Sequence, residues 1–265
     1  MKIFSLMALT AILLVQGCDT KKHKNTEEQS QQSTHMLLST AWYQKAAERK
    51  ALYYQAFNIA KMRVDEILKS DGEKNSAVVL DIDETVLDNS PYQGWCIEND
   101  STFSSSSWDR WVQQGSAAAL NGALDFTNYA MEKGMEVIYI SNRHVSQLDI
   151  TLKNLKDKGF PNASREFVFL KDTTSDKRYR RARVEEKYSI DLLIGDNLGD
   201  FDHLYDKRQN QNAHKVLENQ KALFGNKFIV LPNPMYGKWE RPYQKMDGDY
   251  VENLKKVLKS FTIKQ

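Results

Sequence analysis

The chain has 265 residues, and its formal charges nearly cancel, with 37 lysines and arginines against 35 aspartates and glutamates. A net charge of +2 gives no global field that would gather nucleic acid, and two cysteines cannot form a disulfide framework. The hydrophobic share of 41% is sufficient for a folded domain, and the lack of any apolar run of about 18 residues excludes a multi-pass membrane protein.

Residues 1–17 have the organisation of a secretory signal. Lys2 supplies a positive charge, and residues 3–15 form an apolar stretch that is too short to span a bilayer well. The segment ends in Val15-Gln16-Gly17-Cys18, which resembles the lipobox of bacterial lipoproteins, whose cysteine is acylated and becomes the new N-terminus. A plain secretory signal with an incidental cysteine is the alternative. We therefore predict a lipid anchor on Cys18 in a bacterial cell envelope, at the outer membrane, on its periplasmic or surface face.

Residues 18–35 contain no large apolar side chain and are predicted to be a flexible tether, because such a segment cannot build a core. The rest of the chain, residues 36–265, is predicted to form one domain. Its first part, residues 36–69, carries apolar side chains at helical spacing without an interrupting proline or glycine. This pattern predicts one long helix or two abutting helices.

Short apolar runs then alternate with helical patterns. The predicted strands are 77–80, 137–140, 167–170, 191–194 and 228–231, and the predicted helices are 117–133, 145–158 and 177–187. This alternation predicts an α/β fold with a parallel sheet covered by helices on both faces. Reactive residues in such sheets are expected at the carboxyl ends of the strands.

Acidic side chains follow two of these strands directly. Like charges that lie so close together after buried strands need a compensating cation, and a site rich in carboxylate oxygen suits Mg²⁺. The four candidate metal ligands are Asp81, Asp83, Asp196 and Asp200.

Hydroxyl, amide and basic groups follow the other two strands. Ser141 and Asn142 come at the end of the second strand, and a lysine-containing segment follows the third. Residues 177–183 hold five basic side chains. Most of these are predicted to form a solvated helix face.

These motifs resemble a known set. Asp81-x-Asp83-x-Thr85, Ser141, Lys177 and Gly195-Asp196-x-x-x-Asp200 look like the four motifs of the haloacid dehalogenase (HAD) superfamily of phosphohydrolases. The segments 83–92, 141–143, 195–201 and 231–237 narrow the likeness to class C acid phosphatases, in particular the lipoprotein e type of 5′-nucleotidase, over about residues 36–260. The resemblance implies a HAD-like Rossmannoid sheet with a small, mainly helical cap built from N- and C-terminal segments, and a homodimer.

The motifs also suggest a mechanism. Asp81 is the expected nucleophile that forms an aspartyl-phosphate, and Asp83 is the expected general acid, which then activates water. Ser141 is expected to donate to a phosphoryl oxygen, and Lys177 to offset negative charge there. Asp81→Asn should therefore abolish turnover.

Mg²⁺ is the expected cofactor, because it keeps several waters and takes few protein carboxylates. It would be held by Asp81 and Asp196, with Asp200 acting through waters. The resemblance adds the backbone carbonyl of Asp83 as a ligand.

Aromatic residues are the candidates for holding the leaving group, because bases stack on aromatic rings. By the resemblance, Trp108 and Tyr236 match a pair that sandwiches a nucleobase or nicotinamide ring. Asn142, which offers amide donors at the end of a strand, is a further candidate substrate-binding residue. Trp111 is predicted to pack in the core or the cap, as is Trp95. Asn89 is interpreted as a loop-capping residue.

The leading hypothesis is therefore a Mg²⁺-dependent phosphatase acting on nucleoside 5′-monophosphates, nicotinamide mononucleotide and aryl phosphates. A lipoprotein that binds haem or nucleotides, with secondary catalysis, is the second hypothesis. A phosphotransferase or mutase with the same phospho-enzyme is the third, and the short insertion between Leu87 and Ala117 argues against the closed lid that it would need. Nucleic acid is not expected as a partner.

Overall fold

The structure is a computed structural model that describes residues 35–70, 75–206 and 210–261. The predicted signal, Cys18 and the tether up to Thr34 lie outside the described residues. The last residue assigned to the tether, His35, already belongs to a helix. No helix in the described ranges is long and apolar enough to cross a membrane.

A five-stranded parallel sheet forms the centre of the molecule, in the order β5-β4-β1-β6-β7. The strands are β1 (Ser76–Leu80), β4 (Glu136–His144), β5 (Val168–Lys171), β6 (Ser189–Gly195) and β7 (Phe228–Val230). All five predicted strands are thus confirmed. The chain adds β4 and β5 on one side of β1 and then crosses to add β6 and β7 on the other, so the order reverses beside β1.

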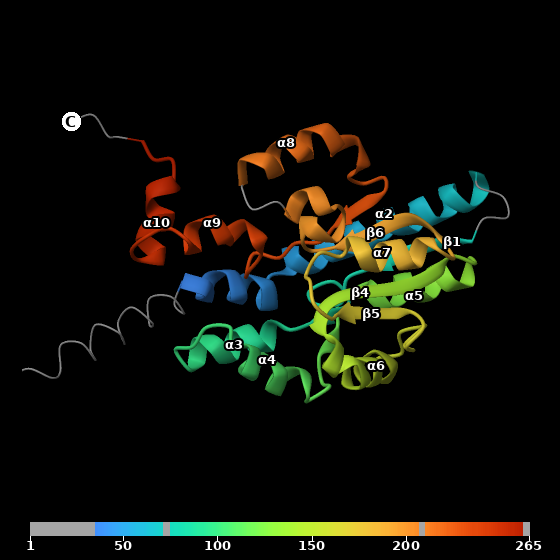
Figure 1. The fold of residues 1–265 in the computed structure, drawn as a ribbon, viewed down its shortest axis with the longest axis horizontal. Coiled ribbons are helices and arrows are strands. Elements are labelled where there is room, and N and C mark those ends of the chain that lie inside the picture. The colour runs from blue at the N-terminus through green and yellow to red at the C-terminus, as the bar shows by residue number, and fades with distance from the viewer. Residues whose placement is uncertain (1–34, 71–74, 207–209, 262–265) are drawn as a thin grey trace, which may run out of the picture.

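Helices cover both faces of this sheet, as predicted (Figure 1). Val78 and Leu80 of β1 pack into one apolar cluster, whereas Ala77 and Val79 pack into the other, because successive strand side chains point to opposite faces. The first cluster includes residues from α2 (Ala47–Ser70), α5 (Ala123–Glu132) and α6 (Leu148–Asp157). The second includes Val184 from α7 (Arg178–Glu185).

A group of helices caps the carboxyl edge of the sheet, at the left of Figure 1. The cap consists of the helical residues 35–45 together with α3 (Ser90–Glu98), α4 (Ser105–Val112), α9 (Arg241–Gln244) and α10 (Tyr250–Val257). Its N- and C-terminal segments touch, since the rings of His35 and Tyr250 meet edge-on with centroids 5.5 Å apart. The Gln44 side chain donates to the carbonyl of Ser90 at 3.1 Å, so the insertion that carries α3 and α4 belongs to the cap as well.

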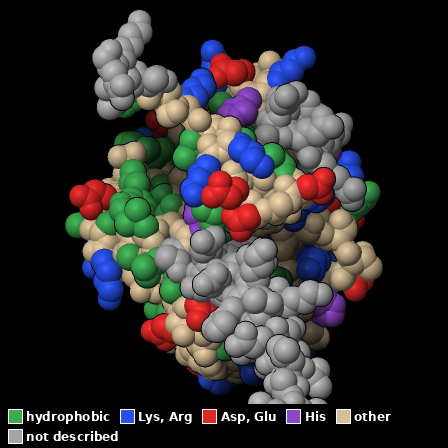
Figure 2. Space-filling view, turned by 90° about the vertical axis from the view of Figure 1, so that its left-hand side faces the viewer, with side chains coloured by type: hydrophobic (Ala, Val, Ile, Leu, Met, Phe, Trp, Pro, Cys, Tyr) green, Lys and Arg blue, Asp and Glu red, His purple; other side chains and the backbone are tan. Residues whose placement is uncertain are grey.

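Figure 2 looks onto this capped end of the molecule. Hydrophobic side chains gather on one side of that face, and acidic and basic side chains lie next to one another near its middle.

The predicted helix 117–133 begins too early. Ala118 and Ala119 instead form β3, which pairs antiparallel with β2 (Leu87–Asp88). The helix α5 starts only at Ala123, after Gly122 adopts a left-handed conformation with φ of 80°. The alanine-rich run has high helix propensity, but pairing with β2 and the turn at Gly122 override it. For residues 36–69, the structure confirms the second predicted alternative, two abutting helices, with the break at Ala46.

The remaining elements are several short 3₁₀ turns, and one further helix that lies between β6 and β7. They are the 3₁₀ turns Val145–Gln147, Leu198–Asp200, His203–Asp206, Lys221–Leu223 and Lys238–Glu240, and α8 (Asn210–Gln220).

Candidate active site

The register of the sheet brings three motif residues together at the carboxyl end of β1. Leu80 at the end of β1 pairs with Tyr139 of β4 and with Ile194 of β6. Asp81 follows Leu80 directly, while Ser141 and Asp196 each lie two residues beyond the partners of Leu80. These groups therefore meet beside β1, where the strand order reverses and parallel sheets bind ligands.

Three of the four predicted carboxylates form one cluster. Ligand oxygens of Asp81, Asp196 and Asp200 all lie within 4.8 Å of one another. Burial raises the pKa of Asp81 to about 7, against the opposing effect of Lys177, and burial also raises the pKa of Asp196 well above its ordinary value. A divalent cation would relieve both the desolvation and the mutual repulsion, so the donor set fits a hard metal ion.

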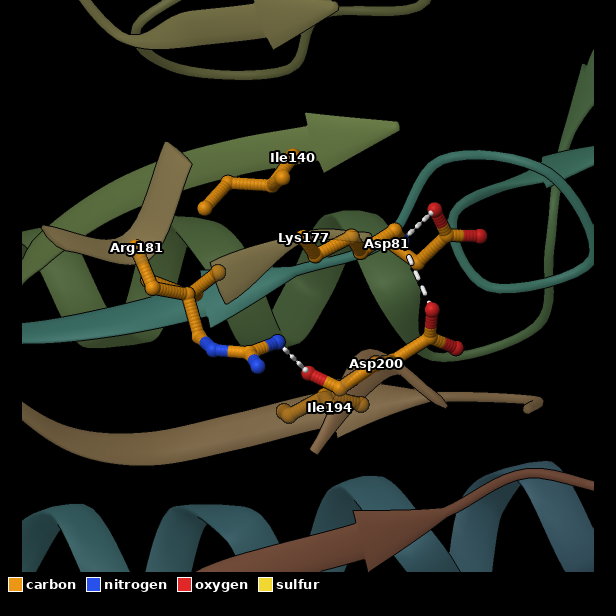
Figure 3. Close-up of a pocket in the computed structure, with 7 residues that line it drawn as sticks. Asp81, Ile140, Lys177, Arg181, Ile194 and Asp200 are labelled. Carbon is orange, nitrogen blue, oxygen red and sulfur yellow. Dashed lines mark hydrogen bonds and ion pairs between the residues drawn. The ribbon is translucent and has the colours of Figure 1, made fainter. Parts of the chain in front are cut away.

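Lys177 links two members of this cluster, Asp81 and Asp200 (Figure 3). Its ammonium forms ion pairs with the carboxylates of Asp81 and Asp200, the latter at 2.7 Å, and its side chain is 3% exposed. Burial alone would lower the pKa of Lys177, but the two carboxylates raise it above its usual value. Lys177 therefore stays a cation at the place where the sequence predicted one.

The loop after β6 fixes Asp200 by close contact. A Cβ atom on Gly195 would lie 2.4 Å from an Oδ atom of Asp200, so residue 195 must lack a side chain. The same oxygen accepts a hydrogen bond from the backbone N–H of Asn197 at 2.9 Å. Asp200 thus completes the capping box of the 3₁₀ turn Leu198–Asp200, whose N-cap is Asn197, and also faces the acidic cluster.

The prediction for the basic segment 177–183 was wrong in part. Arg180 and Arg181 are buried, although most of this segment was expected to be a solvated face. Arg180 donates to the backbone carbonyl of Ser141 and, at 2.8 Å, to the side-chain oxygen of Asn142. Arg181 donates to the backbone carbonyl of Asp200 at 2.8 Å (Figure 3). Both arginines hold the backbone of the site, which charge alone could not indicate.

Asp83 lies apart from the carboxylate triad and is held by three donors. Its carboxylate accepts hydrogen bonds from Ser141 Oγ at 3.1 Å, from Asn89 Nδ2 at 2.9 Å and from Arg143 Nε at 2.9 Å. Ser141, predicted to face the phosphoryl group, thus touches Asp83. Arg143 and Asn89 were missed as site residues, although they stand in the segments 141–143 and 83–92 that carry the family resemblance.

Asp196 has partners from two distant segments. Its Oδ2 accepts from Asn233 Nδ2 at 2.9 Å, and its Oδ1 lies 3.5 Å from the hydroxyl of Thr85. Asn233 belongs to segment 231–237, one of the segments that carry the family resemblance. The sequence analysis nevertheless assigned Asn233 no role at the site.

Both predicted stacking residues touch groups that flank Asp83. The guanidinium of Arg143 lies 5.9 Å from the centre of the Trp108 ring. The hydroxyl of Tyr236 donates to Glu84, whose side chain is fully buried and whose backbone has φ of 57°. Burial raises the pKa of Glu84 well above its ordinary value. Glu84, another site residue that the sequence did not indicate, thus anchors Tyr236.

Comparisons with known proteins agree with this geometry. The family model for the HAD superfamily, subfamily IIIB (acid phosphatase), matches residues 7–239. The structure is similar to that of the class C acid phosphatase from Bacillus anthracis, with a TM-score of 0.81 and 39% identity over 89% of this chain and 100% of that chain. A structure of the same enzyme with tungstate bound also has a TM-score of 0.81 and 39% identity, over 87% of this chain and 99% of that chain.

Two plant proteins are similar in sequence. The stem 31 kDa glycoprotein of Glycine max is 30% identical over 201 residues, which is 72% of this chain and 68% of that protein. Acid phosphatase 1 of Solanum lycopersicum is 26% identical over 192 residues, which is 66% of this chain and 68% of that protein.

Proposed function

Because the chain belongs to subfamily IIIB of the HAD superfamily, the acid phosphatases, we propose that it hydrolyses phosphomonoesters through a phosphorylated Asp81. The observation that carries the proposal is the buried cluster in which Lys177 bridges Asp81 and Asp200 beside Asp196. A lysine and three carboxylates in one buried cluster form a preorganised site for the charge that a phosphoryl group brings.

Asp81 is the nucleophile of this proposal. One of its oxygens attacks phosphorus in line, and the bond between phosphorus and the ester oxygen breaks. Asp83 supplies the proton that the leaving oxygen needs, and in the second step it takes a proton from the water that attacks the aspartyl-phosphate. Inorganic phosphate leaves and Asp81 is regenerated.

Mg²⁺ is the proposed metal, since HAD phosphatases generally use a divalent metal and the clustered side-chain donors here are carboxylates. Asp81, Asp196 and Asp200, with the backbone carbonyl of Asp83, would hold it. Such an ion would neutralise charge on the phosphoryl oxygens and on the clustered carboxylates.

The proposed substrates are nucleoside 5′-monophosphates, nicotinamide mononucleotide and aryl phosphates. Trp108 and Tyr236 would hold the aromatic part, while Ser141, Asn142 and Lys177 would face the phosphoryl group. The Bacillus anthracis relative was solved with tungstate, a tetrahedral oxyanion of the same shape as phosphate, which supports an oxyanion site here.

One assay tests this function. Phosphate release is measured from AMP, nicotinamide mononucleotide and 4-nitrophenyl phosphate, with Mg²⁺ or with EDTA, across acidic and neutral pH. The proposal expects metal-dependent release from all three esters. Release that persists in EDTA would overturn the metal assignment, and binding of AMP or haem without release by a folded protein would favour the binding hypothesis.

The envelope location and the oligomeric state are separate proposals. We propose from the sequence that Cys18 carries the lipid anchor at the outer membrane, and from the family resemblance that the protein is a homodimer. Labelling of the wild type, but not of Cys18→Ser, by a palmitate analogue tests the anchor. Light scattering of residues 19–265 tests the dimer.

A further inference from the structure

We propose that Asn89 and Trp111 are positioning residues that orient Asp83 through one buried hydrogen-bond network, so that the cap helix α4 sets the geometry of proton donation. This inference rests on the proposed role of Asp83 as the general acid. Neither side chain belongs to the acidic cluster, and both were interpreted from the sequence as capping or packing residues.

Asn89 is the centre of the network. Its Nδ2 group donates to Asp83 Oδ1 at 2.9 Å and to the backbone carbonyl of Leu87 at 3.3 Å. Its Oδ1 accepts from Trp111 Nε1 at 2.8 Å and from Arg143 at 3.3 Å. All the hydrogen-bonding sites of this amide are therefore used, and its side chain is fully buried.

Only one orientation of the Asn89 amide fits these partners. Trp111 Nε1 and the guanidinium of Arg143 can only donate, so they require an acceptor oxygen in front of them. A flipped amide would place its NH₂ group against those two donors and its oxygen against the carboxylate of Asp83. Trp111 thus fixes the NH₂ group of Asn89 on Asp83.

Arg143 holds Asp83 from a second direction. Its Nε and one terminal nitrogen both lie 2.9 Å from Asp83 Oδ1, and its other terminal nitrogen donates to Thr151 at 3.2 Å. The Arg143 side chain is 1% exposed, whereas that of Asp83 is 16% exposed. Asp83 therefore remains accessible while its surroundings are buried and fixed.

The helix α4 connects this network to the leaving-group side of the site. It carries Trp111, and it also carries Trp108, whose ring lies under the guanidinium of Arg143. Asp109, between them, accepts from Gln147 at 2.8 Å and so fastens α4 to the 3₁₀ turn that follows β4. The residue proposed to hold the leaving group and the residue that orients the acid thus sit on one helix.

The test is the dependence of the rate on the leaving group, because only a poor leaving group needs a proton in the first step. The second-order constant kcat/KM is measured for 4-nitrophenyl phosphate, whose leaving group departs readily as an anion, and for phenyl phosphate, whose leaving group is as basic as tyrosine. Trp111→Phe keeps the ring and removes the N–H donor. Trp95→Phe, a similar exchange at a half-exposed residue, is the matched control.

In Trp111→Phe we expect kcat/KM for phenyl phosphate to fall about tenfold and that for 4-nitrophenyl phosphate to fall less than about threefold, a part of the 10²–10⁴-fold that general acids contribute. Asn89→Ser should show the same selectivity more strongly, and Trp95→Phe should change neither. Thermal unfolding in the presence of Mg²⁺ verifies that each variant is folded. Equal losses for both esters in a folded Trp111→Phe variant, or no loss, would overturn the inference.

The variant Asp83→Asn separates this inference from the function on which it rests. If Asp83→Asn loses phenyl phosphate hydrolysis selectively while Trp111→Phe and Asn89→Ser do not, Asp83 is the acid and the positioning network is wrong. If Asp83→Asn itself shows no such selectivity, the proposed role of Asp83 fails, and the network has no proton donor to position.

Discussion

The carboxylate of Asp200 occupies the space where a side chain on Gly195 would begin. A Cβ atom at that glycine would lie 2.4 Å from Oδ2 and 2.6 Å from Cβ of Asp200. The contact is possible only because β6 ends in glycine, and it turns the Asp200 carboxylate toward Lys177, which pairs with the other oxygen at 2.7 Å. The glycine at the end of β6 therefore sets the position of Asp200, a candidate metal ligand five residues further along the chain.

Gly195→Ala should weaken metal binding. The added methyl must displace Asp200 from the acidic cluster, so we expect the Mg²⁺ concentration for half-maximal activity to rise about tenfold or more, as for loss of a group that orients a metal site. Gly94→Ala is the matched control, because its Cβ would meet only Gln44, at an ordinary 3.6 Å. Titration of activity with Mg²⁺ measures the effect, and unchanged Mg²⁺ dependence in Gly195→Ala would contradict this role of Asp200.

Lys177→Met should impair both activity and folding. Removing one partner of a buried ion pair leaves uncompensated carboxylates, which typically costs about 3–5 kcal/mol of stability. The loss of one preorganised charge at the phosphoryl group should lower kcat about 10²–10³-fold. Lys171→Met, at the end of β5, removes a lysine that stands outside the cluster and serves as the control. Urea unfolding and 4-nitrophenyl phosphate kinetics measure the two effects, and a variant with wild-type kcat would refute the role of Lys177.

The metal-free protein should become less stable as the pH rises. Burial raises the pKa of Asp81 from 3.8 to about 7 and that of Asp196 well above 3.8. The folded state therefore binds more protons than the unfolded state between these values, so the free energy of unfolding falls as the pH rises from about 4 through about 7.

Mg²⁺ should reverse this trend, because it binds ionised carboxylates. We expect Mg²⁺ to raise the melting temperature more at about pH 8 than at about pH 5. Thermal unfolding in EDTA and in Mg²⁺ at several pH values measures this, and Asp196→Asn should reduce both the pH dependence and the Mg²⁺ effect. Equal stabilisation by Mg²⁺ at both pH values would contradict the assignment of the cluster.

Trp108→Ala should reduce selectivity for aromatic substrates. Stacking of a base on an aromatic ring contributes about 1–3 kcal/mol, so kcat/KM for AMP should fall about tenfold. Glycerol phosphate has no ring to stack and should lose less than about threefold, which makes it the internal control. Equal losses for the two esters would show that Trp108 does not hold the base.

The sheet and the acidic cluster could be predicted because each depends on local pattern. β1 is a buried five-residue run, and Asp81 follows it directly. The alternation of strand and helix patterns was therefore enough to predict that the carboxylates lie at one edge of a parallel sheet. The same logic placed Ser141, which lies in β4, the strand that pairs with β1, whereas Lys177 was assigned to the site from the family resemblance.

The parts that were missed depend on contacts between distant segments. Arg180 and Arg181 look like a charged helix face, but they reach backbone carbonyls of Ser141 and Asp200, which no periodicity encodes. Asn89, in the loop before α3, and Trp111, in α4, are hydrogen-bonded although they lie 22 residues apart in the sequence. Polar side chains that satisfy one another in this way are visible only once the chain is folded.

Trapping of the phospho-enzyme tests the central claim most directly. Wild type and Asp81→Asn are mixed with phosphoryl-labelled AMP and Mg²⁺, quenched in acid within the first turnover, and digested. We predict labelled phosphate on the peptide that contains Asp81 in the wild type, and neither label nor phosphate release in Asp81→Asn. Label on a different residue, or turnover by Asp81→Asn at the wild-type rate, would contradict the assignment of Asp81 as the nucleophile.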